Sequence, residues 1–215
     1  MILALEFSSL RRSVALADHT GMVLAEAVDS TGGRGTNALG LIAKVLAAKN
    51  IPRSNVQVLA VGLGPGSYAG IRAAIAIAQG WHLARGAKLL GIRSTDSMGA
   101  GAQTEKRFGR VNFVVDAQRG EFYLSAWEIS GLARRELSPL RIVTSAELEN
   151  RKASGEICAG PDTEPPLFPT AAMAAALAQT RSDFVSAETL APVYLREPGF
   201  VKVTPGRNLQ DSTAF

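Results

Sequence analysis

The chain begins with three short apolar runs that are separated by polar residues. The runs ILALEF, SVALAD and MVLAEAV have the length and composition of β-strands, and residues 8–12 and 19–21 supply the connections between them. Such short connections join strands that are neighbours in one sheet. The pattern therefore predicts a three-stranded β-meander at the start of the chain.

Two helices are predicted after the meander. Within residues 36–48 apolar residues recur every three or four positions, and Thr36 or Asn37 can cap this helix. A strand in VQVLAVGLG then leads through a Gly-Pro-Gly-Ser turn to a longer helix over residues 68–85, with Ser67 as its cap. We therefore expect a strand–helix unit in which the second helix is unusually apolar.

The remaining elements alternate between strands and helices. The run AKLLGI predicts a strand, and a short helix ending near residue 102 follows it, capped by Ser94 or Thr95. VNFVVDAQRGEFYLSAWEI is typical of a strand, a turn and a strand, and RRELSPLRIVT can extend that sheet at its edge. A helix capped by Ser145, a strand in GEICAGP and an Ala-rich helix in TAAMAAALAQT complete the pattern.

This order of elements predicts an α/β protein with two lobes, each a mixed sheet with packed helices, the second lobe being reduced. The polar segment QTEKRFGR marks the boundary, so residues 1–102 form the first lobe and residues 103–204 the second. The pattern leaves open whether the last helix packs back near the lobe junction. Residues 205–215 are expected to form a disordered tail.

Composition narrows the class of protein. With 215 residues, 47% apolar and 20% charged, the chain can form a globular core. Its net charge of +4 is compatible with an RNA-associated role, but no Lys/Arg-rich run points to one. A single cysteine, Cys158, excludes a disulfide framework within the chain. Glu6 interrupts the first apolar run and no stretch suits a membrane span, so we expect a cytoplasmic protein without membrane contact.

The residues offer little for catalysis. The two histidines, His19 and His82, form no i, i+4 pair, so no metal site and no catalytic residue are predicted. The turn at residues 64–67 resembles a phosphate-binding loop, but it lacks the lysine that such a loop requires. Its glycines are better explained by a sharp strand-to-helix turn.

The helix over residues 68–85 is apolar almost all round, whereas packing on one sheet needs only a stripe. Its many small residues would let another helix approach closely. We therefore predict a partner interface on the two helices. It comprises Leu39, Ile42, Leu46, Ile71, Ala74, Ile75, Ala78, Trp81 and His82. The alternative is that the two helices only cover each other and the sheet.

Four motifs in order resemble one family. ILALEFSSLRRSVAL, GPGSYAGIRAAIAIAQG, VDAQRGEFY and APVYLR together resemble the bacterial TsaB family, also called YeaZ, over residues 2–196. The resemblance implies the two-lobed ASKHA fold of actin, Hsp70 and sugar kinases. It also implies a non-catalytic partner of TsaD, the subunit that transfers a threonylcarbamoyl group to N6 of adenosine 37 in tRNAs reading codons that begin with A.

The same resemblance implies further partners: a TsaE-like ATPase, and tRNA through the complex. A homodimer through the same helices is expected when TsaD is absent, because the apolar face still needs cover. The resemblance also places a nucleotide cleft between the lobes, for which the superfamily pattern identifies Glu6, Ser8, Ser9, Asp116, Gln118, Gly120 and Gly160. Glu6 stands where the family commonly has Asp, so we interpret the cleft as vestigial, with weak nucleotide binding at most and no other cofactor. Two alternatives stay open: an ATPase or small-molecule kinase that uses this cleft, and a glycoprotease-like peptidase.

Overall fold

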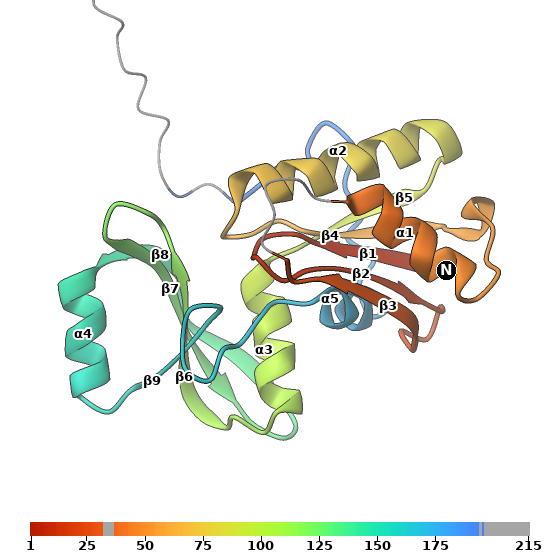
Figure 1. Cartoon of the computed structure of the whole chain (residues 1–215). Helices are drawn as coiled ribbons and strands as arrows, with labels where there is room; N and C mark the ends of the chain where they lie inside the picture. Colours follow the sequence, from red (N-terminus) through yellow and green to blue (C-terminus); the bar gives the residue numbers. More distant parts are fainter. Residues whose placement is uncertain (32–36, 194, 196–215) are drawn as a thin grey trace, which may run out of the picture.

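Two sheets with helices on both faces make up the protein. The computed structural model describes residues 1–31, 37–193 and 195, and the two lobes lie side by side (Figure 1). The predicted α/β class with two mixed sheets is confirmed. The expected tail, residues 205–215, lies outside the described residues. No helix in the described part combines the length and hydropathy that a membrane span needs.

The first sheet contains the predicted meander and two parallel strands. Its order is β3-β2-β1-β4-β5. The strands are β1 (Ile2–Glu6), β2 (Arg12–Ala17), β3 (Val23–Asp29), β4 (Val58–Gly62) and β5 (Lys88–Ile92). β2 pairs antiparallel with both β1 and β3, whereas β1–β4 and β4–β5 are parallel. The parallel strands β4 and β5 are joined through a helix, residues 68–85, whereas the chain from β1 to β4 passes through β2, β3 and a helix over residues 38–47.

Helices cover both faces of this sheet. α1 (Ala38–Ala47) and α2 (Tyr68–Arg85) lie on one face and α5 (Ala171–Ala178) on the other (Figure 1). Every residue of β1 is buried: Leu3 and Leu5 belong to the core under α1 and α2, whereas Ala4 faces α5. Alanines on that second face let the Ala-rich helix approach the sheet closely. Thus α5, which lies within residues 103–204, packs on the sheet of the first lobe.

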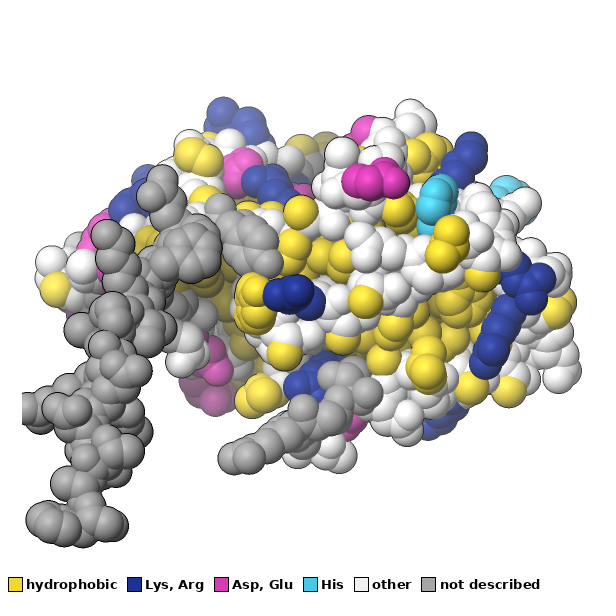
Figure 2. Space-filling model, turned by 90° about the horizontal axis from the view of Figure 1, so that it is seen from above, with side chains coloured by type: hydrophobic (Ala, Val, Ile, Leu, Met, Phe, Trp, Pro, Cys, Tyr) yellow, Lys and Arg dark blue, Asp and Glu magenta, His cyan; other side chains and the backbone are white. Residues whose placement is uncertain are grey.

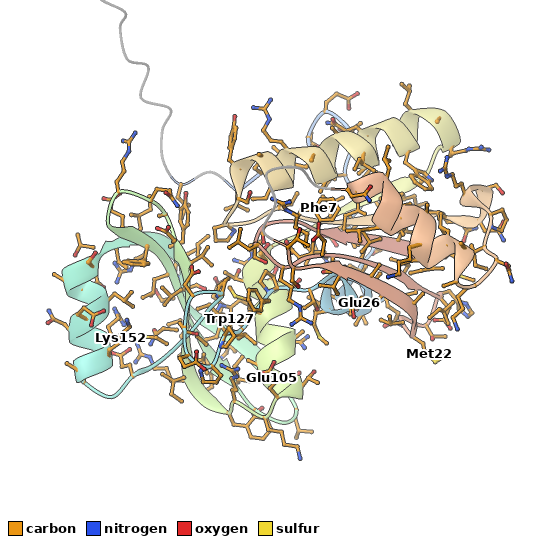
Figure 3. All side chains as sticks on the ribbon, in the orientation of Figure 1. Phe7, Met22, Glu26, Glu105, Trp127 and Lys152 are labelled. Carbon is orange, nitrogen blue, oxygen red and sulfur yellow. The ribbon has the colours of Figure 1, made fainter. Side chains whose placement is uncertain are left out.

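The second sheet has the order β8-β7-β6-β9. Its strands are β6 (Gly109–Asp116), β7 (Glu121–Ile129), β8 (Arg134–Thr144) and β9 (Ile157–Ala159). α3 (Ser94–Thr104) packs on one face, and α4 (Ser145–Ala153) packs on the other. Trp127 of β7 lies beside α3 in the second lobe, whereas Phe7 lies at the end of β1 in the first (Figure 3).

Two of the predicted caps are wrong. The Thr144 hydroxyl, not Ser145, caps α4 by accepting from Glu147 N, because the β-conformation that a cap needs falls on Thr144. α3 has no side-chain cap, since the hydroxyl of Ser94 is turned into the core instead. The expected caps of the first two helices are found: Asn37 accepts from Gly40 N, and Ser67 from Gly70 N.

The chain after α5 returns to the edge of the first sheet. Val185 N donates to Leu89 O over 3.0 Å, and Val193 N donates to Leu63 O over 2.9 Å. The amide of Gln79 on α2 donates to Ala187 O over 2.7 Å. The free edge of β5 is therefore covered by the chain's own C-terminal segment rather than left open for another strand.

Candidate functional site

Two hollows in the described part of the surface concern the predicted sites, one between the lobes and one between α1 and α2. The inter-lobe cleft has a volume of about 1070 Å³, and four of the residues predicted for it line it: Ser8, Ser9, Asp116 and Gln118. The other three, Glu6, Gly120 and Gly160, are not among its lining residues. The cleft is therefore large enough for a small molecule, but only four of the seven residues that were predicted for it line it.

Glu6 is turned away from the cleft and into the core. Its side chain is completely buried, Oε1 accepts from Ser8 N at 2.9 Å, and Oε2 accepts from Ser94 Oγ at 3.0 Å. A Cβ at Gly62 would lie 2.2 Å from Glu6 Oε2, so the glycine makes room for this carboxyl group. Burial raises the pKa of Glu6 and so favours its neutral form. Glu6 therefore joins β1 to the start of α3 and is not among the residues that line the cleft.

Asp116 belongs to a hairpin turn. Its Oδ1 accepts from Gln118 N and its Oδ2 from Gln118 Nε2, both over 2.7 Å. Gln118, Arg119 and Gly120 follow with positive φ angles of 65°, 62° and 75°. Asx turns of this kind are ordinary hairpin chemistry. Glu6 and Asp116, both predicted for a vestigial cleft, therefore do not face each other across it, because only Asp116 is among the residues that line the cleft.

The glycines that resembled a phosphate-binding loop serve close packing. A Cβ at Gly66 would lie 2.1 Å from Ser8 O. Gly160, which was predicted for the cleft and lies outside this loop, also serves close packing, because a Cβ there would lie 1.9 Å from Val114 O. Ser67 N donates to Ser8 O over 2.7 Å, so this amide is already used. Gly64 and Gly66 have φ angles of +88° and +145°, which L side chains rarely adopt. The interpretation of residues 64–67 as a sharp turn is confirmed.

Most of the residues predicted for a partner interface lie inside the chain's own core. Six of the nine are buried between the helices and the first sheet: Ile42, Leu46, Ile71, Ala74, Ile75 and Ala78. As direct contact residues, five of the six are a wrong prediction, because these faces of α1 and α2 pack on Leu3, Leu5 and their neighbours. The sixth, Ile42, is buried but also lines a groove between the two helices. Leu39 is exposed, whereas Trp81 and His82 are partly exposed.

His82 closes the end of α2. Its Nδ1 lies 2.9 Å from Ala87 O, and Gly86, in the left-handed conformation, ends the helix between them. Its side chain thus has a structural partner within the chain.

A groove remains between the two helices on their outer side. It has a volume of about 330 Å³, and we call it the α1/α2 groove. Its lining residues are Leu39, Ile42, Arg53, Ile77, Gly80, Trp81, Ala84 and Arg85. Figure 2 looks onto this face and shows hydrophobic side chains gathered along the helices, with Lys and Arg side chains at the margin. The predicted interface contains only three of these residues, Leu39, Ile42 and Trp81.

More than half of this chain is similar in sequence to a known protein family. A family model described as "TsaD: tRNA N6-adenosine threonylcarbamoyltransferase" matches residues 35–159, which is more than half of the chain. The chain belongs to this family. The matched residues run from α1 to β9 and so include the α1/α2 groove and the second sheet, but not β1–β3 or α5.

Within the family, the similarity is to TsaB and YeaZ proteins. Residues of this chain are 31% identical over 90 positions to the tRNA threonylcarbamoyladenosine biosynthesis protein TsaB of Escherichia coli (strain K12). That alignment spans 42% of this chain and 39% of the relative. The predicted resemblance to the TsaB/YeaZ family is confirmed.

Two solved structures from Pseudomonas aeruginosa share the fold. One, a protein described as similar to peptidase YeaZ, has a TM-score of 0.78 at 25% identity and covers 91% of this chain and 99% of its own. The other, YeaZ, has a TM-score of 0.75 at 23% identity, with coverages of 90% and 99%. The two-lobed architecture is therefore that of YeaZ proteins over nearly the whole chain.

Proposed function

We propose that this protein is a non-catalytic subunit of the machinery that makes threonylcarbamoyladenosine in tRNA. In this role it binds a TsaD-like catalytic subunit through the α1/α2 groove. It acts in the cytoplasm, with a TsaE-like ATPase and with tRNA bound through the complex. The similarity to TsaB supports the proposed role in threonylcarbamoyladenosine synthesis, and the α1/α2 groove supports the proposed site of contact.

The groove is the observation that carries the proposed contact. Apolar side chains that the protein's own packing leaves uncovered usually mark an interface. On α2 the exposed side includes Ala76, Gly80 and Leu83, the last with 88% of its surface accessible. A Cβ at Gly80 would meet nothing within 4 Å. A glycine within a helix costs about 1 kcal/mol relative to alanine, and the monomer gives no reason for it. The close approach of a second helix would explain the glycine at this position.

The inter-lobe cleft supports an accessory role more than a kinase or ATPase. The acid that would stand nearest the phosphates, Glu6, is buried and hydrogen-bonded to Ser8 and Ser94. Asp116 remains at the cleft, but both its oxygens accept hydrogen bonds from Gln118. Phosphoryl transfer depends on accurately placed charge, and this arrangement does not supply it.

Reconstitution tests the proposed function. Purified TsaD-like subunit and TsaE-like ATPase are supplied with tRNA and threonylcarbamoyl-adenylate, and threonylcarbamoyladenosine is measured by mass spectrometry of the digested tRNA. We expect product only when this chain is added, and none from this chain alone. Asp116→Ala is the matched variant and should support the reaction as the wild type does. Product formation that is independent of the chain would contradict the proposed function, and loss of activity in Asp116→Ala would favour a catalytic cleft.

A further inference from the structure

The inter-lobe cleft has side chains for which the proposed function gives no use. Its volume of about 1070 Å³ matches that of small-molecule sites. One wall consists of the turn between β1 and β2 and the start of α2, and the other consists of the turn between β6 and β7 and the segment between β9 and α5. A molecule bound there would contact both lobes.

Three buried polar side chains run from the core of the first lobe to this cleft. Glu6, Ser94 and Ser8 are 0%, 0% and 4% exposed, and of the three only Ser8 lines the cleft. Ser94 Oγ lies 3.0 Å from Glu6 Oε2 and 2.9 Å from Ser8 Oγ. A serine hydroxyl has one hydrogen, so Ser94 can donate to only one of these neighbours. The protonation of Glu6 decides which of them it is.

The surroundings of Glu6 favour its neutral form. Glu6 forms no salt bridge with any residue that the structure describes, and a fully buried carboxylate without a cation loses the hydration that stabilises its charge. Burial accordingly raises the pKa of Glu6. The neighbouring elements place four residues without a titratable side chain against it: Ser8, Ser13, Gly62 and Ser94. The neutral carboxyl group donates its proton to Ser94 Oγ.

This order of donors leaves one hydrogen at the cleft unused. When Glu6 donates to Ser94, the hydroxyl of Ser94 donates to Ser8 Oγ over 2.9 Å. The hydrogen of Ser8 then has no acceptor among the residues that the structure describes. A buried donor without an acceptor is unfavourable, so an acceptor atom of a ligand at this point of the cleft would be stabilised.

Arg11, on the same turn as Ser8, is a second donor at the cleft. Its guanidinium group lies over the Phe168 ring, 5.7 Å from the centroid, and forms no salt bridge within the described part of the chain. Two hydrogen bonds hold the pair in place: Ser9 Oγ donates to Arg11 O over 3.2 Å, and Ala171 N donates to Ser13 Oγ over 2.8 Å. A cation beside an aromatic ring suits an anionic group that is attached to an apolar body.

The other charges of the cleft limit a ligand to one negative charge. Besides Arg11, the charged residues that line it are Asp116 and Asp162. Asp116 accepts two hydrogen bonds from Gln118 but keeps its charge. Two carboxylates in one cleft repel a chain of phosphates, whereas a single carboxylate can be paired by the arginine. The half-buried ring of Tyr123 adds apolar surface on the wall of the second lobe.

We propose that the inter-lobe cleft binds a monocarboxylate with an aromatic or other apolar body, whose carboxylate accepts hydrogen bonds from Ser8 Oγ and Arg11. Because both lobes contact this ligand, its binding would couple their placement to the concentration of a small molecule. The cleft shares no lining residue with the α1/α2 groove, so the inference goes beyond the proposed function and does not depend on it.

Nuclear magnetic resonance of the ¹⁵N-labelled chain tests the inference with four probes. Phenylacetate, phenethylamine and phenyl phosphate share one ring and carry one negative, one positive and about two negative charges at neutral pH, and ADP represents a nucleotide. We expect phenylacetate to shift the amide signals of residues 8–11, 115–118 and 168, with a dissociation constant of about 1 mM. The other three probes should bind at least about tenfold more weakly.

Four variants test the roles of the side chains with phenylacetate. Arg11→Gln and Ser8→Ala should each weaken binding about tenfold, because each removes a donor to the carboxylate. Glu6→Gln should bind as the wild type does, because its amide donates to Ser94 as the neutral acid does. Arg135→Gln, on the exposed part of β8, is the control for Arg11→Gln and should have no effect. Circular dichroism confirms that each variant is folded.

Each other result would overturn the inference. Such results are equal or tighter binding of phenethylamine or ADP, shifts confined to α1 and α2, and no binding of any probe. Wild-type affinity in Arg11→Gln would exclude the arginine as the partner of the carboxylate. Loss of binding in a folded Glu6→Gln variant would show that the wild type needs an ionised Glu6, which contradicts the order of donors. None of these results bears on the proposed function, because the TsaD-like subunit is absent from the experiment.

Discussion

Gly80→Glu is expected to abolish binding of the TsaD-like subunit and to leave this protein folded. Gly80 lies in the α1/α2 groove and is exposed, and a side chain there meets no atom of the chain within 4 Å. Glutamate also favours the helix more than glycine does, so the monomer should not lose stability. In the complex the same carboxylate would be buried in the interface without a partner charge. An unpaired buried charge costs about 3 to 5 kcal/mol, so affinity should fall by at least about 100-fold.

Gly80→Ala is the control for this variant. Alanine should raise the free energy of unfolding by about 0.5 to 1 kcal/mol, because it removes the backbone freedom of glycine in a helix. Its methyl group should weaken binding far less than the carboxylate does. Isothermal titration calorimetry measures the affinity, and urea unfolding measures the stability. Wild-type affinity in Gly80→Glu would show that the partner binds elsewhere.

Gly70→Ala, in the same helix, is expected to act in the opposite direction on stability. A Cβ at Gly70 would lie 2.1 Å from Phe7 O, a backbone atom that is fixed by the first sheet. The start of α2 would have to move away from β1, whose residues and Phe7 are buried under it. Overpacking of this kind costs about 1 to 3 kcal/mol, and we expect the upper end because the neighbour is backbone.

Urea unfolding of Gly70→Ala beside Gly80→Ala makes the comparison direct. The two variants introduce the same methyl group into α2 at positions that differ in what surrounds them. We expect Gly70→Ala to unfold at a lower urea concentration than the wild type and Gly80→Ala at a higher one. Equal shifts would mean that helix propensity decides both positions and that the contact between α2 and the end of β1 is looser than described.

The order of strands and helices could be predicted from the sequence because local patterns determine it. The runs of β1 and β2 are too apolar and too short for any element other than a buried strand. α2 has the predicted bounds because Ser67 caps it and Gly86 ends it. Thr144 was missed as the cap of α4 because Thr144 and the neighbouring Ser145 can both act as caps, and only the extended backbone conformation at Thr144 decides between them.

The buried face of α2 could not be predicted because the helix is apolar almost all round. Ile71, Ala74 and Ala78 face the sheet, while Ile77, Gly80 and Ala84 face the groove, and both sets have helical spacing. Tertiary packing decides between them. The direction of the Glu6 side chain is likewise set by partners far along the chain, since Ser94 is 88 residues away.

The two arginines that line the groove, Arg53 and Arg85, come from a segment that a search for cation-rich runs does not detect. The cations of residues 30–95 are widely spaced, and what distinguishes the segment is that it lacks acids. Arg53 lies in the turn before β4 and Arg85 at the end of α2, so only the fold brings them to the same groove. Absence of one sign of charge over many residues is thus as informative as a run of the other.

Protection of a cysteine placed in the groove tests the central claim most directly. In a Cys158→Ser background, Leu39→Cys labels the groove and Leu132→Cys labels the second lobe; these leucines are 67% and 100% exposed. The rate of maleimide alkylation is measured for each variant with and without the TsaD-like subunit. We predict that the subunit slows alkylation at position 39 in proportion to the fraction bound and leaves position 132 unchanged. Unchanged alkylation at position 39 in a saturated complex would contradict the claim that the α1/α2 groove is the binding surface.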